Sequence, residues 1–494
     1  MPTPRLSRDT LPLVASGVAI PRYQQSHITP GIVHFGVGGF HRAHEAMVLD
    51  TLMSQGKASD WGIVGVGVRP SDLSMRDALI PQNCLYSLTI KDMGGQTTRV
   101  IASIVDFLYG PDDPSLVLEV LCDPAIRIVS LTITEGGYNF DQITGEFDWS
   151  HPDIAADLDR LSAPHTVYGF ITEALRRRKE AGTKPFTVMS CDNIQSNGHL
   201  AKKMFVSFAS RVDPKLALWI ERTVAFPNSM VDRITPVTTP EDIAEAKSIT
   251  GLSDNWPVVA ESFFQWVIED DFPAGRPPFE EAGAQLVADV EPYELMKLRL
   301  LNASHQGLTY FGYLMGYRLV HDAVNDPLIH TLLRRYMAEE AEATLRPVPG
   351  VNLAEYQNTL ISRFANSRVK DTIARLCADS SDRIPKWLVP VIVDRLDNGQ
   401  DVSLSAAIVA SWARYAEGQD EEGNAIEVVD NLKVEMMARA ARHSEDPLAF
   451  VRNEKLFGNL VNQEEFTTPY LWALTMLHES GARATLASLI HGRN

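Results

Sequence analysis

The stretch of sequence that decides the fold runs from Gly31 to His44 and reads Gly31-Ile-Val-His-Phe-Gly-Val-Gly-Gly-Phe-His-Arg-Ala-His44. Its first six residues form a pattern typical of a short buried strand, and residues 41–55 follow a helical pattern. Glycines between them let the backbone turn sharply and approach a pyrophosphate, and the helix N-terminus offers free N–H groups. The residues of this turn predicted to bind a dinucleotide are Gly36, Gly38, Gly39 and Phe40.

The common pattern G-x-G-x-x-G has a third glycine where this chain has His41. A tight strand-to-helix turn without a ligand is therefore the alternative interpretation. A ribose partner is expected after the next strand, residues 61–68. Asp72 would accept the ribose hydroxyls and repel a 2′-phosphate, whereas Arg69 would attract one. The alternative for Asp72 is a plain turn aspartate, because it lies farther from the glycines than the usual ~20 residues.

Strand-like and helix-like segments alternate through the first half of the chain, which predicts a doubly wound parallel sheet of Rossmann type. The expected strands are residues 31–36, 61–68, 126–134 and 186–190, and the expected helices are 41–55 and 166–181. Beyond about residue 292 long amphipathic patterns dominate, which predicts a mainly α-helical domain. We expect domains at 1–286 and 287–494, with the proline-rich segment 270–280 as the linker candidate.

Composition narrows the possible partners. Among 494 residues, 45 are lysine or arginine and 63 are aspartate or glutamate, so the net charge is −18. This acidic balance argues against nucleic acid and against anionic membranes as partners. The four cysteines form no disulfide or zinc pattern, and neither a signal peptide nor a membrane span is evident. A cytoplasmic protein is therefore expected.

The segment from Glu294 to Leu308 holds the most informative polar residues. With Lys297 at 0° on a helical wheel, Glu294 falls near ~60°, His305 near ~80° and Asn302 near ~140°. Leucines surround the wheel, which is typical of a buried helix. A desolvated lysine can act as a general base near neutral pH. The alternative is a buried Lys297–Glu294 salt bridge with His305 as a core histidine.

Two predicted strands end in polar residues, at the edge where open α/β sheets bind ligands. Glu135 follows residues 126–134 and would exchange a proton; the alternative is a solvated loop acid. Asn193 follows residues 186–190 and would donate from its amide; the alternative is a cap or Asx turn. No zinc-binding spacing is present, so no catalytic metal is predicted.

Several of these motifs together resemble one family, the polyol-specific long-chain dehydrogenases/reductases. The matching stretches are Gly36-Val-Gly-Gly-Phe-His-Arg-Ala-His44, Thr132-Ile-Thr-Glu-Gly-Gly137, Ser190-Cys-Asp-Asn193, Phe226-Pro-Asn-Ser-Met-Val-Asp-Arg-Ile-Thr-Pro236 and Lys297-x4-Asn302-x2-His305. The resemblance implies a Rossmann-type domain, a helical C-terminal domain and metal-independent, NAD-dependent oxidation of a sugar alcohol. D-mannitol is the first expected substrate, with D-arabinitol or sorbitol next, and the resemblance implies a monomer.

The resemblance also implies roles for individual residues. Lys297 would be the general base, while Asn193 and Asn302 would hold the oxygen that becomes the carbonyl. His305 would orient the substrate and Glu135 would exchange the proton with solvent. The implied substrate-binding residues are Asp232, Glu294, Arg375 and Arg383.

The chain departs from the family at two places. It reads Ser71-Asp72 where the family has a Glu-Asp pair, and it has arginine at 383 where the family has lysine. Arg375 or Arg383 would also suit a carboxylate substrate, so a reductase of a keto sugar acid such as fructuronate is the first alternative. A non-catalytic dinucleotide-binding regulator is the second, which the lysine–asparagine–histidine set argues against.

Overall fold

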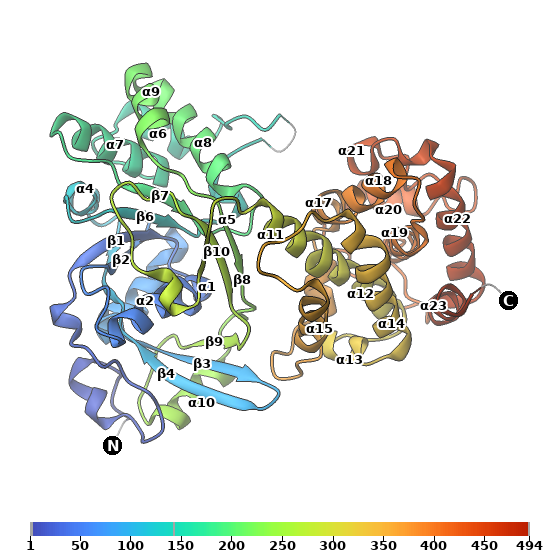
Figure 1. Cartoon of the computed structure of the whole chain (residues 1–494), viewed down its shortest axis with the longest axis horizontal. Coiled ribbons are helices and arrows are strands. Elements are labelled where there is room, and N and C mark those ends of the chain that lie inside the picture. The colour runs from blue at the N-terminus through green and yellow to red at the C-terminus, as the bar shows by residue number, and fades with distance from the viewer. Residues whose placement is uncertain (1–2, 142–143, 493–494) are drawn as a thin grey trace. The chain divides into compact units, whose positions relative to one another are not determined.

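The computed structural model describes residues 3–141 and 144–492. The chain divides into two compact units, Met1–Val290 and Glu291–Asn494, and each is described by itself (Figure 1). The sequence places the domain boundary between residues 286 and 287. All four cysteines are free. No helix among the described residues is both long and apolar enough to cross a bilayer.

The N-terminal unit is built on a five-stranded parallel sheet, which confirms the predicted α/β fold class. Across the sheet the strands are β5 (Ile104–Tyr109), β2 (Gly62–Gly67), β1 (Pro30–Phe35), β6 (Ile128–Leu131) and β7 (Thr187–Ser190). The chain proceeds from β1 through β2 to β5 on one side, and then crosses to β6 and β7 on the other. The strand order therefore reverses beside β1, and ligands bind at such a switch point.

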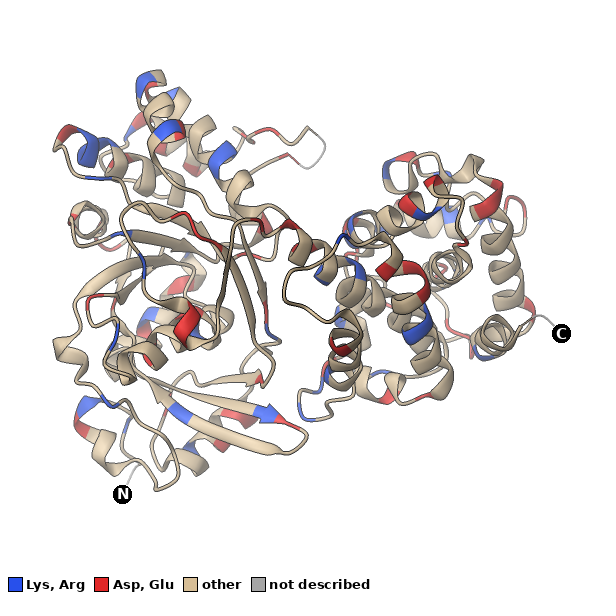
Figure 2. Cartoon of the chain, viewed as in Figure 1, with Lys and Arg blue, Asp and Glu red and all other residues tan. Residues whose placement is uncertain are grey.

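Alternating residues of the central strands face two helical layers. Val33 and Phe35 belong to a core formed with α4, α7 and α8, whereas Ile32 belongs to a second core with α2 and α3. Burying one such side chain stabilises the fold by about 1.5–3 kcal/mol. Strands β2, β1, β6 and β7 contain no lysine, arginine, aspartate or glutamate, and they are tan in Figure 2. Burial on both faces explains this composition.

The helices of this unit are α1 (Gly39–Ala43), α2 (Glu45–Ser54), α3 (Leu73–Leu79), α4 (Pro114–Cys122), α5 (Thr134–Gly137), α6 (Pro152–Asp159), α7 (Val167–Glu180), α8 (Asn197–Val212), α9 (Pro214–Thr223) and α10 (Pro240–Thr250). The predicted helix at 166–181 is confirmed as α7. The predicted helix at 41–55 is instead broken in two at His44, whose φ and ψ are −121° and −98°. These angles lie outside the α region, so the helix cannot continue through this residue.

Two small sheets that the sequence patterns did not predict complete the unit. One has the order β4 (Gly95–Ile101), β3 (Tyr86–Asp92), β9 (Val258–Glu261); the other has the order β11 (Gln285–Val287), β10 (Gln265–Glu269), β8 (Ser229–Asp232). The prediction that residues 270–280 form a linker is wrong. This segment joins β10 to β11, which pair in parallel, and Phe279 is fully buried in the core beneath them.

The C-terminal unit is helical, as predicted, and its described residues form no strand longer than an isolated bridge. Its α-helices are α11 (Glu291–Met296), α12 (Ala303–Leu314), α13 (Val320–Val324), α14 (Pro327–Arg335), α15 (Leu353–Phe364), α16 (Ile373–Cys377), α17 (Ser380–Trp387), α18 (Val389–Asp397), α19 (Ser403–Tyr415), α20 (Lys433–Ala440), α21 (Glu454–Phe457), α22 (Glu464–Glu479) and α23 (Gly481–His491). Helix α12 packs on α19, where Gly307 leaves room for Ile408. The rings of Tyr310 and Trp412 stack across the same contact.

A buried carboxylate holds the start of α19. Glu340 lies in the π-helical segment η7 (Tyr336–Ala341), and its two oxygens accept from the backbone N–H groups of Leu404 (2.8 Å) and Ser405 (2.9 Å). The Ser405 hydroxyl donates to the same carboxylate. Burial raises the pKa of Glu340 from 4.5 to about 7, although these hydrogen bonds oppose the shift.

This raised pKa predicts that the fold loses stability as pH rises. Because the folded-state pKa lies above the unfolded-state value, the contribution of Glu340 is complete below pH 4.5 and is lost as pH rises through about 7. The loss is at most about 3 kcal/mol. Denaturant unfolding at pH 5 and pH 8 should show a smaller fall in unfolding free energy for Glu340→Gln than for the wild type. Glu339→Gln, at the neighbouring exposed position, should match the wild type.

Candidate cofactor and catalytic sites

The glycine turn lies at the carboxyl end of β1, beside the switch point. Gly36 has a φ of +95°, and a Cβ there would lie 2.1 Å from the Thr132 carbonyl oxygen, so only glycine fits. The Thr132 hydroxyl donates to the Gly36 carbonyl at 2.7 Å and ties the turn to the end of β6. A Cβ on Gly38 or Gly39 would meet nothing closer than 3.5 Å. Packing within the protein therefore does not require glycine at 38 or 39, which agrees with a role for these glycines in letting a pyrophosphate approach the backbone.

The residues after the turn pack inward. Phe40 is half-buried, and its ring stacks on that of His44 at a centroid distance of 4.7 Å. His41 is fully buried, and its ring stacks on His34 of β1 at 3.4 Å. His41, which stands where the common pattern has its third glycine, therefore packs in the interior of the unit beneath the turn.

Asp72 closes the turn after β2. Its Oδ2 accepts from the backbone N–H groups of Val68 (3.0 Å) and Arg69 (2.9 Å), which is the arrangement of a turn aspartate. Its Oδ1 lies 3.6 Å from the Arg69 guanidinium, which is 59% exposed. One carboxylate oxygen thus stabilises the loop, and the second lies beside an exposed cation at the end of β2.

Asp192, which the sequence analysis did not single out, joins the ends of β6 and β7. Its Oδ1 accepts from the Thr134 N–H at 2.8 Å, and its Oδ2 accepts from the Ile133 N–H (3.1 Å) and the Tyr138 hydroxyl (2.9 Å). Burial raises the pKa of Asp192, while these hydrogen bonds lower it. Thr134 has a φ of +64°, a strained conformation for a β-branched residue that the carboxylate stabilises.

The two candidate residues at these strand ends are both exposed. Glu135 lies in the short helix α5, and Asn193 lies directly after Asp192. Asp192 binds the backbone just before Glu135 and is itself the residue before Asn193, so it fixes the backbone next to both candidates. A signal for it was present in the sequence, since an acid at a strand end is placed to bind the neighbouring loop's N–H groups.

The loop after Asn193 is also anchored to β8, which ends at Asp232. The Asn197 side chain donates to the Ser229 carbonyl at 2.8 Å and accepts from the Ser229 N–H at 2.9 Å. Asp232 is buried and lies opposite Gln265 in the register of β8 and β10. This pair of hydrogen bonds joins the segment that follows Asn193 to the strand that ends at Asp232.

In the C-terminal unit the lysine segment is not the continuous α-helix that its pattern predicts. Residues Lys297–Asn302 form a π-helical turn, η6, between α11 and α12. Such a turn contains one extra residue, because its hydrogen bonds run from i to i+5. Relative to Lys297, Asn302 shifts from about 140° to about 40°, and His305 shifts from about 80° to about −20°. The π turn therefore brings the three side chains onto one narrow face.

Contacts within the C-terminal unit hold this turn. The Arg299 guanidinium donates to Asp394 of α18 at 2.6 Å and to the Thr344 carbonyl at 2.8 Å. The Tyr336 hydroxyl donates to the Arg299 carbonyl at 3.1 Å. The His305 ring packs on Phe364 of α15 at a centroid distance of 4.4 Å. The candidate residues Glu294, Lys297, Asn302 and His305 are all buried.

The two arginines predicted to bind substrate are engaged locally. The Arg375 guanidinium forms a bidentate pair with Asp371, at 2.7 and 2.6 Å. Arg383 donates to the carbonyl of Leu376 at 3.0 Å near the end of α16. The pair with Asp371 uses two of the five N–H donors of the Arg375 guanidinium, which is 57% exposed.

Two clusters among the described residues have metal-ligand types, and neither includes a candidate catalytic residue. In the first, His34, His41 and Glu45, both His34 nitrogens lie at 2.8–2.9 Å from hydroxyl groups. In the second, Glu417, His443 and His478, the imidazole rings stack nearly parallel, at 9° and 3.8 Å. Parallel rings do not direct their nitrogen lone pairs at a common centre, as a tetrahedral ion requires.

Comparison with known families matches both units. The family model described as the mannitol dehydrogenase Rossmann domain matches residues 30–281, and the mannitol dehydrogenase C-terminal domain matches residues 289–476. A mannitol 2-dehydrogenase of Phaeosphaeria nodorum is 44% identical over 474 residues, 95% of this chain and 83% of the relative. Mannitol dehydrogenase 2 of Saccharomyces cerevisiae is 41% identical, with 98% of this chain and 97% of the relative covered.

Two solved structures are similar over almost the whole chain. The Pseudomonas fluorescens mannitol 2-dehydrogenase, in a ternary complex with NAD and D-mannitol, is 41% identical with a TM-score of 0.88 and covers 99% of both chains. A substrate-free D-sorbitol dehydrogenase is 40% identical with a TM-score of 0.91, covering 97% of this chain and all of the other.

Proposed function

The chain belongs to the mannitol dehydrogenase family, and from this membership we propose that it catalyses the NAD-dependent oxidation of a sugar alcohol to a ketose and the reverse reduction. Membership confirms the resemblance drawn from the motifs and makes the protein an oxidoreductase. D-mannitol, oxidised to D-fructose, is the first proposed substrate, with sorbitol and D-arabinitol next. The proposed monomeric state and cytoplasmic location rest on the sequence alone.

The observation that carries a catalytic role is the π turn. It aligns a lysine, an asparagine and a histidine on one face, and π turns inside α-helices are frequent at functional sites. A regulator that only binds a dinucleotide does not need a buried lysine, asparagine and histidine aligned on one helix face. The alignment therefore supports the dehydrogenase over the non-catalytic alternative.

The glycine turn would hold the pyrophosphate of NAD, which supplies the hydride acceptor. Neutral Lys297 takes the hydroxyl proton during oxidation and, as an ammonium, returns it during reduction. Asn193 and Asn302 donate to the oxygen on which negative charge develops. His305 orients the substrate.

Other residues bind the substrate or exchange the proton. Glu135 lies exposed in α5, which suits the exchange of a proton with solvent. The proposed substrate-binding residues are Asp232, Glu294, Arg375 and Arg383. No metal takes part in the proposed mechanism.

A reductase of a keto sugar acid stays the alternative to a polyol dehydrogenase. The Arg375 guanidinium pairs with Asp371 through two of its five N–H donors, so this pair does not exclude a carboxylate substrate. The deciding experiment is a panel of D-mannitol, D-arabinitol, sorbitol and, in the reducing direction, fructuronate, with both NAD and NADP. We expect the highest kcat/KM with D-mannitol and NAD; turnover of fructuronate alone would establish the sugar-acid alternative.

Cofactor choice depends on the charge of Asp72. Asp72→Asn keeps an oxygen that can accept from the backbone N–H groups of Val68 and Arg69, but it removes the charge that repels a 2′-phosphate. The ratio of kcat/KM for NADP over NAD should rise about tenfold, consistent with about 1.4 kcal/mol. Asp77→Asn, on the exposed face of α3, removes one charge elsewhere and should leave the ratio unchanged. An unchanged ratio in Asp72→Asn contradicts the assignment.

Chelation tests metal independence. In the proposed mechanism the amine handles the proton and two amides stabilise the alkoxide, so no task is left for a zinc ion. Prolonged dialysis against a strong chelator should leave polyol oxidation unchanged, and elemental analysis should find no stoichiometric zinc. Loss of activity on chelation, with recovery on adding zinc, would refute the lysine mechanism.

A further inference from the structure

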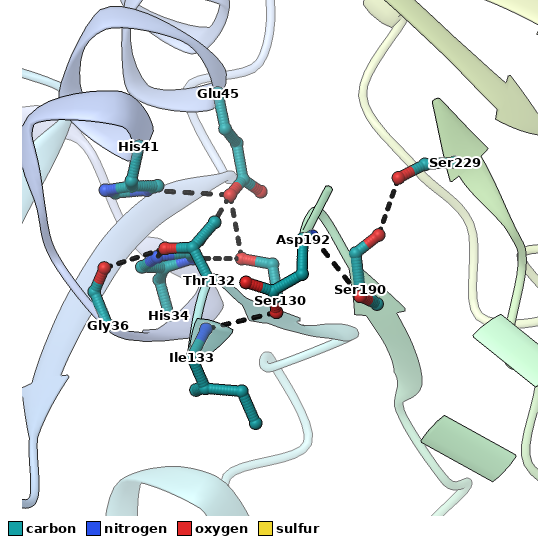
Figure 3. A network of polar contacts seen from close by, with 10 residues as sticks. All are labelled: His34, Gly36, His41, Glu45, Ser130, Thr132, Ile133, Ser190, Asp192 and Ser229. Atoms are coloured by element: carbon teal, nitrogen blue, oxygen red, sulfur yellow. Dashed lines mark hydrogen bonds and ion pairs between the residues drawn. The ribbon is translucent and has the colours of Figure 1, made fainter. Parts of the chain in front are cut away.

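The carboxyl ends of β6 and β7 lead to one proposed functional residue each, Glu135 and Asn193, and one buried carboxylate joins the two segments. Figure 3 shows this residue, Asp192, which follows β7 and reaches Ile133 at the end of β6. Its Oδ2 accepts from the Ile133 N–H at 3.1 Å, and its Oδ1 accepts from the Thr134 N–H at 2.8 Å. These N–H groups belong to the two residues directly before Glu135. The Asp192 side chain therefore fixes the backbone from which Glu135 extends.

The backbone of Asp192 is hydrogen-bonded as well. Its N–H donates to the Ser190 hydroxyl at 3.3 Å, and its carbonyl accepts from the Asn197 side chain and the Ile194 N–H, both at 2.9 Å. The Ile194 bond closes a three-residue turn with Asn193 at its centre. Every polar atom of Asp192 thus has a partner within the protein, and the backbone on both sides of Asn193 is fixed with it.

The segment before Glu135 does not keep its shape by local preference. Thr134 has a φ of +64°, which is unfavourable for a β-branched residue because its Cβ crowds the backbone there. The hydrogen bond from its N–H to Asp192 offsets this cost. Without that bond we expect Thr134 to relax to a negative φ, and Glu135, as the next residue, to move with it.

We propose that Asp192 is a positioning residue, which holds Glu135 and Asn193 in fixed places relative to each other. Asp192 is buried, whereas Glu135 and Asn193 are exposed, so it acts through them. This role rests on the proposed function, in which Glu135 exchanges the proton with solvent and Asn193 donates to the oxygen that becomes the carbonyl. A shift of about 1 Å in such a group can cost about 100-fold in rate.

Asp192→Asn tests the role at nearly constant volume. Both backbone partners are donors, so in either orientation of the new amide one of them faces an NH₂ group in place of an oxygen. In a single turnover with D-mannitol, we expect the rate constant of NADH formation to fall about 10–100-fold, with the Kd for NADH within about twofold of the wild type. A variant that only folds less well lowers the amplitude and leaves the rate constant unchanged. An unchanged rate constant overturns the proposal.

The matched control is Asp157→Asn. Asp157 of α6 is also buried and accepts from two consecutive backbone N–H groups, those of His165 (2.7 Å) and Thr166 (2.9 Å), and from the Thr166 hydroxyl. These partners belong to none of the candidate segments. Asp157→Asn should therefore keep the wild-type rate constant, and a loss equal to that of Asp192→Asn would refute the positioning role.

A doubly substituted background separates positioning from other effects. In a chain that already carries Glu135→Gln and Asn193→Ala, nothing is left for Asp192 to position, so Asp192→Asn should lower the rate constant by less than about threefold further. The same factor in both backgrounds contradicts the proposal. If the background itself kept the wild-type rate constant, the proposed roles of Glu135 and Asn193 would be wrong, and the positioning role would fall with them.

Amide hydrogen exchange reads the geometry without any turnover. At least one of the N–H groups of Ile133 and Thr134 should exchange faster in Asp192→Asn than in the wild type, because it has lost its acceptor. Unchanged protection of both overturns the proposal, whether or not the protein oxidises polyols. If Asp192→Asn fails to fold, Tyr138→Phe replaces it, since it removes only the hydroxyl that donates to Oδ2 at 2.9 Å. It should lower the rate constant by a smaller factor, and a wild-type rate constant there counts against the proposal.

Discussion

Replacing Lys297 by alanine is expected to lower kcat for polyol oxidation by about 10³-fold or more, while the affinity for NADH stays close to that of the wild type. The substitution removes the proposed proton acceptor from the π turn but leaves the glycine turn untouched. Because oxidation needs the neutral amine and reduction needs the ammonium, wild-type oxidation should rise with pH and reduction should fall. Steady-state kinetics in both directions and NADH fluorescence titration measure these effects.

Rescue and a control variant separate chemistry from folding. Small primary amines added to Lys297→Ala should restore part of the activity, since they supply a base in the space left by the side chain. Lys386→Ala removes a half-exposed lysine of α17 that pairs with Asp382, and it should behave as the wild type. Near-normal turnover of Lys297→Ala would exclude this lysine as the general base.

Replacing Asn302 by alanine is expected to lower kcat/KM by about 10²–10³-fold. The π turn places Asn302 on the face of Lys297, so its amide can donate to the oxygen whose proton the lysine removes. Asn193→Ala should lose a similar factor, because it removes the second proposed donor. The measurement is kcat and KM for D-mannitol, and the loss should appear mainly in kcat.

The control for this prediction is another helical asparagine of the same unit. Asn358 lies on an exposed face of α15, where it accepts from Arg334, and Asn358→Ala should retain full activity. If Asn302→Ala raises KM but leaves kcat unchanged, the amide binds the ground state only. That result would remove Asn302 from the proposed stabilisation of the developing alkoxide.

The parallel sheet was predictable because its signals are local. Runs such as residues 31–36 and 186–190 are short, mostly apolar and free of Lys, Arg, Asp and Glu, since helices cover both faces of the sheet, and the glycines at 36, 38 and 39 mark the turn. The strands β8, β10 and β11 have only three to five residues each, which is too short for a periodic pattern. The composition of segment 270–280, which is rich in proline, therefore predicts a linker, although the segment joins β10 to β11 within the N-terminal unit.

Some features of the candidate sites have no local signal at all. The sequence Lys297–Asn302 is compatible with an ordinary α-helix, and the π turn occurs where packing holds it, through Arg299 on Asp394 and Tyr336 on the Arg299 carbonyl. The break of the predicted helix at His44 likewise accompanies the burial of His41 against His34.

By itself the sequence determined the α/β class, the helical second half, the glycine turn and the family, because each depends on residue types at short, fixed spacings. Only the tertiary structure decided how Asp192 joins two strand ends and how Asp72 binds the backbone of its own turn. Hydrogen bonds between residues far apart in the chain set the first of these features. The number of donors and acceptors at one place can be counted only after the chain has folded.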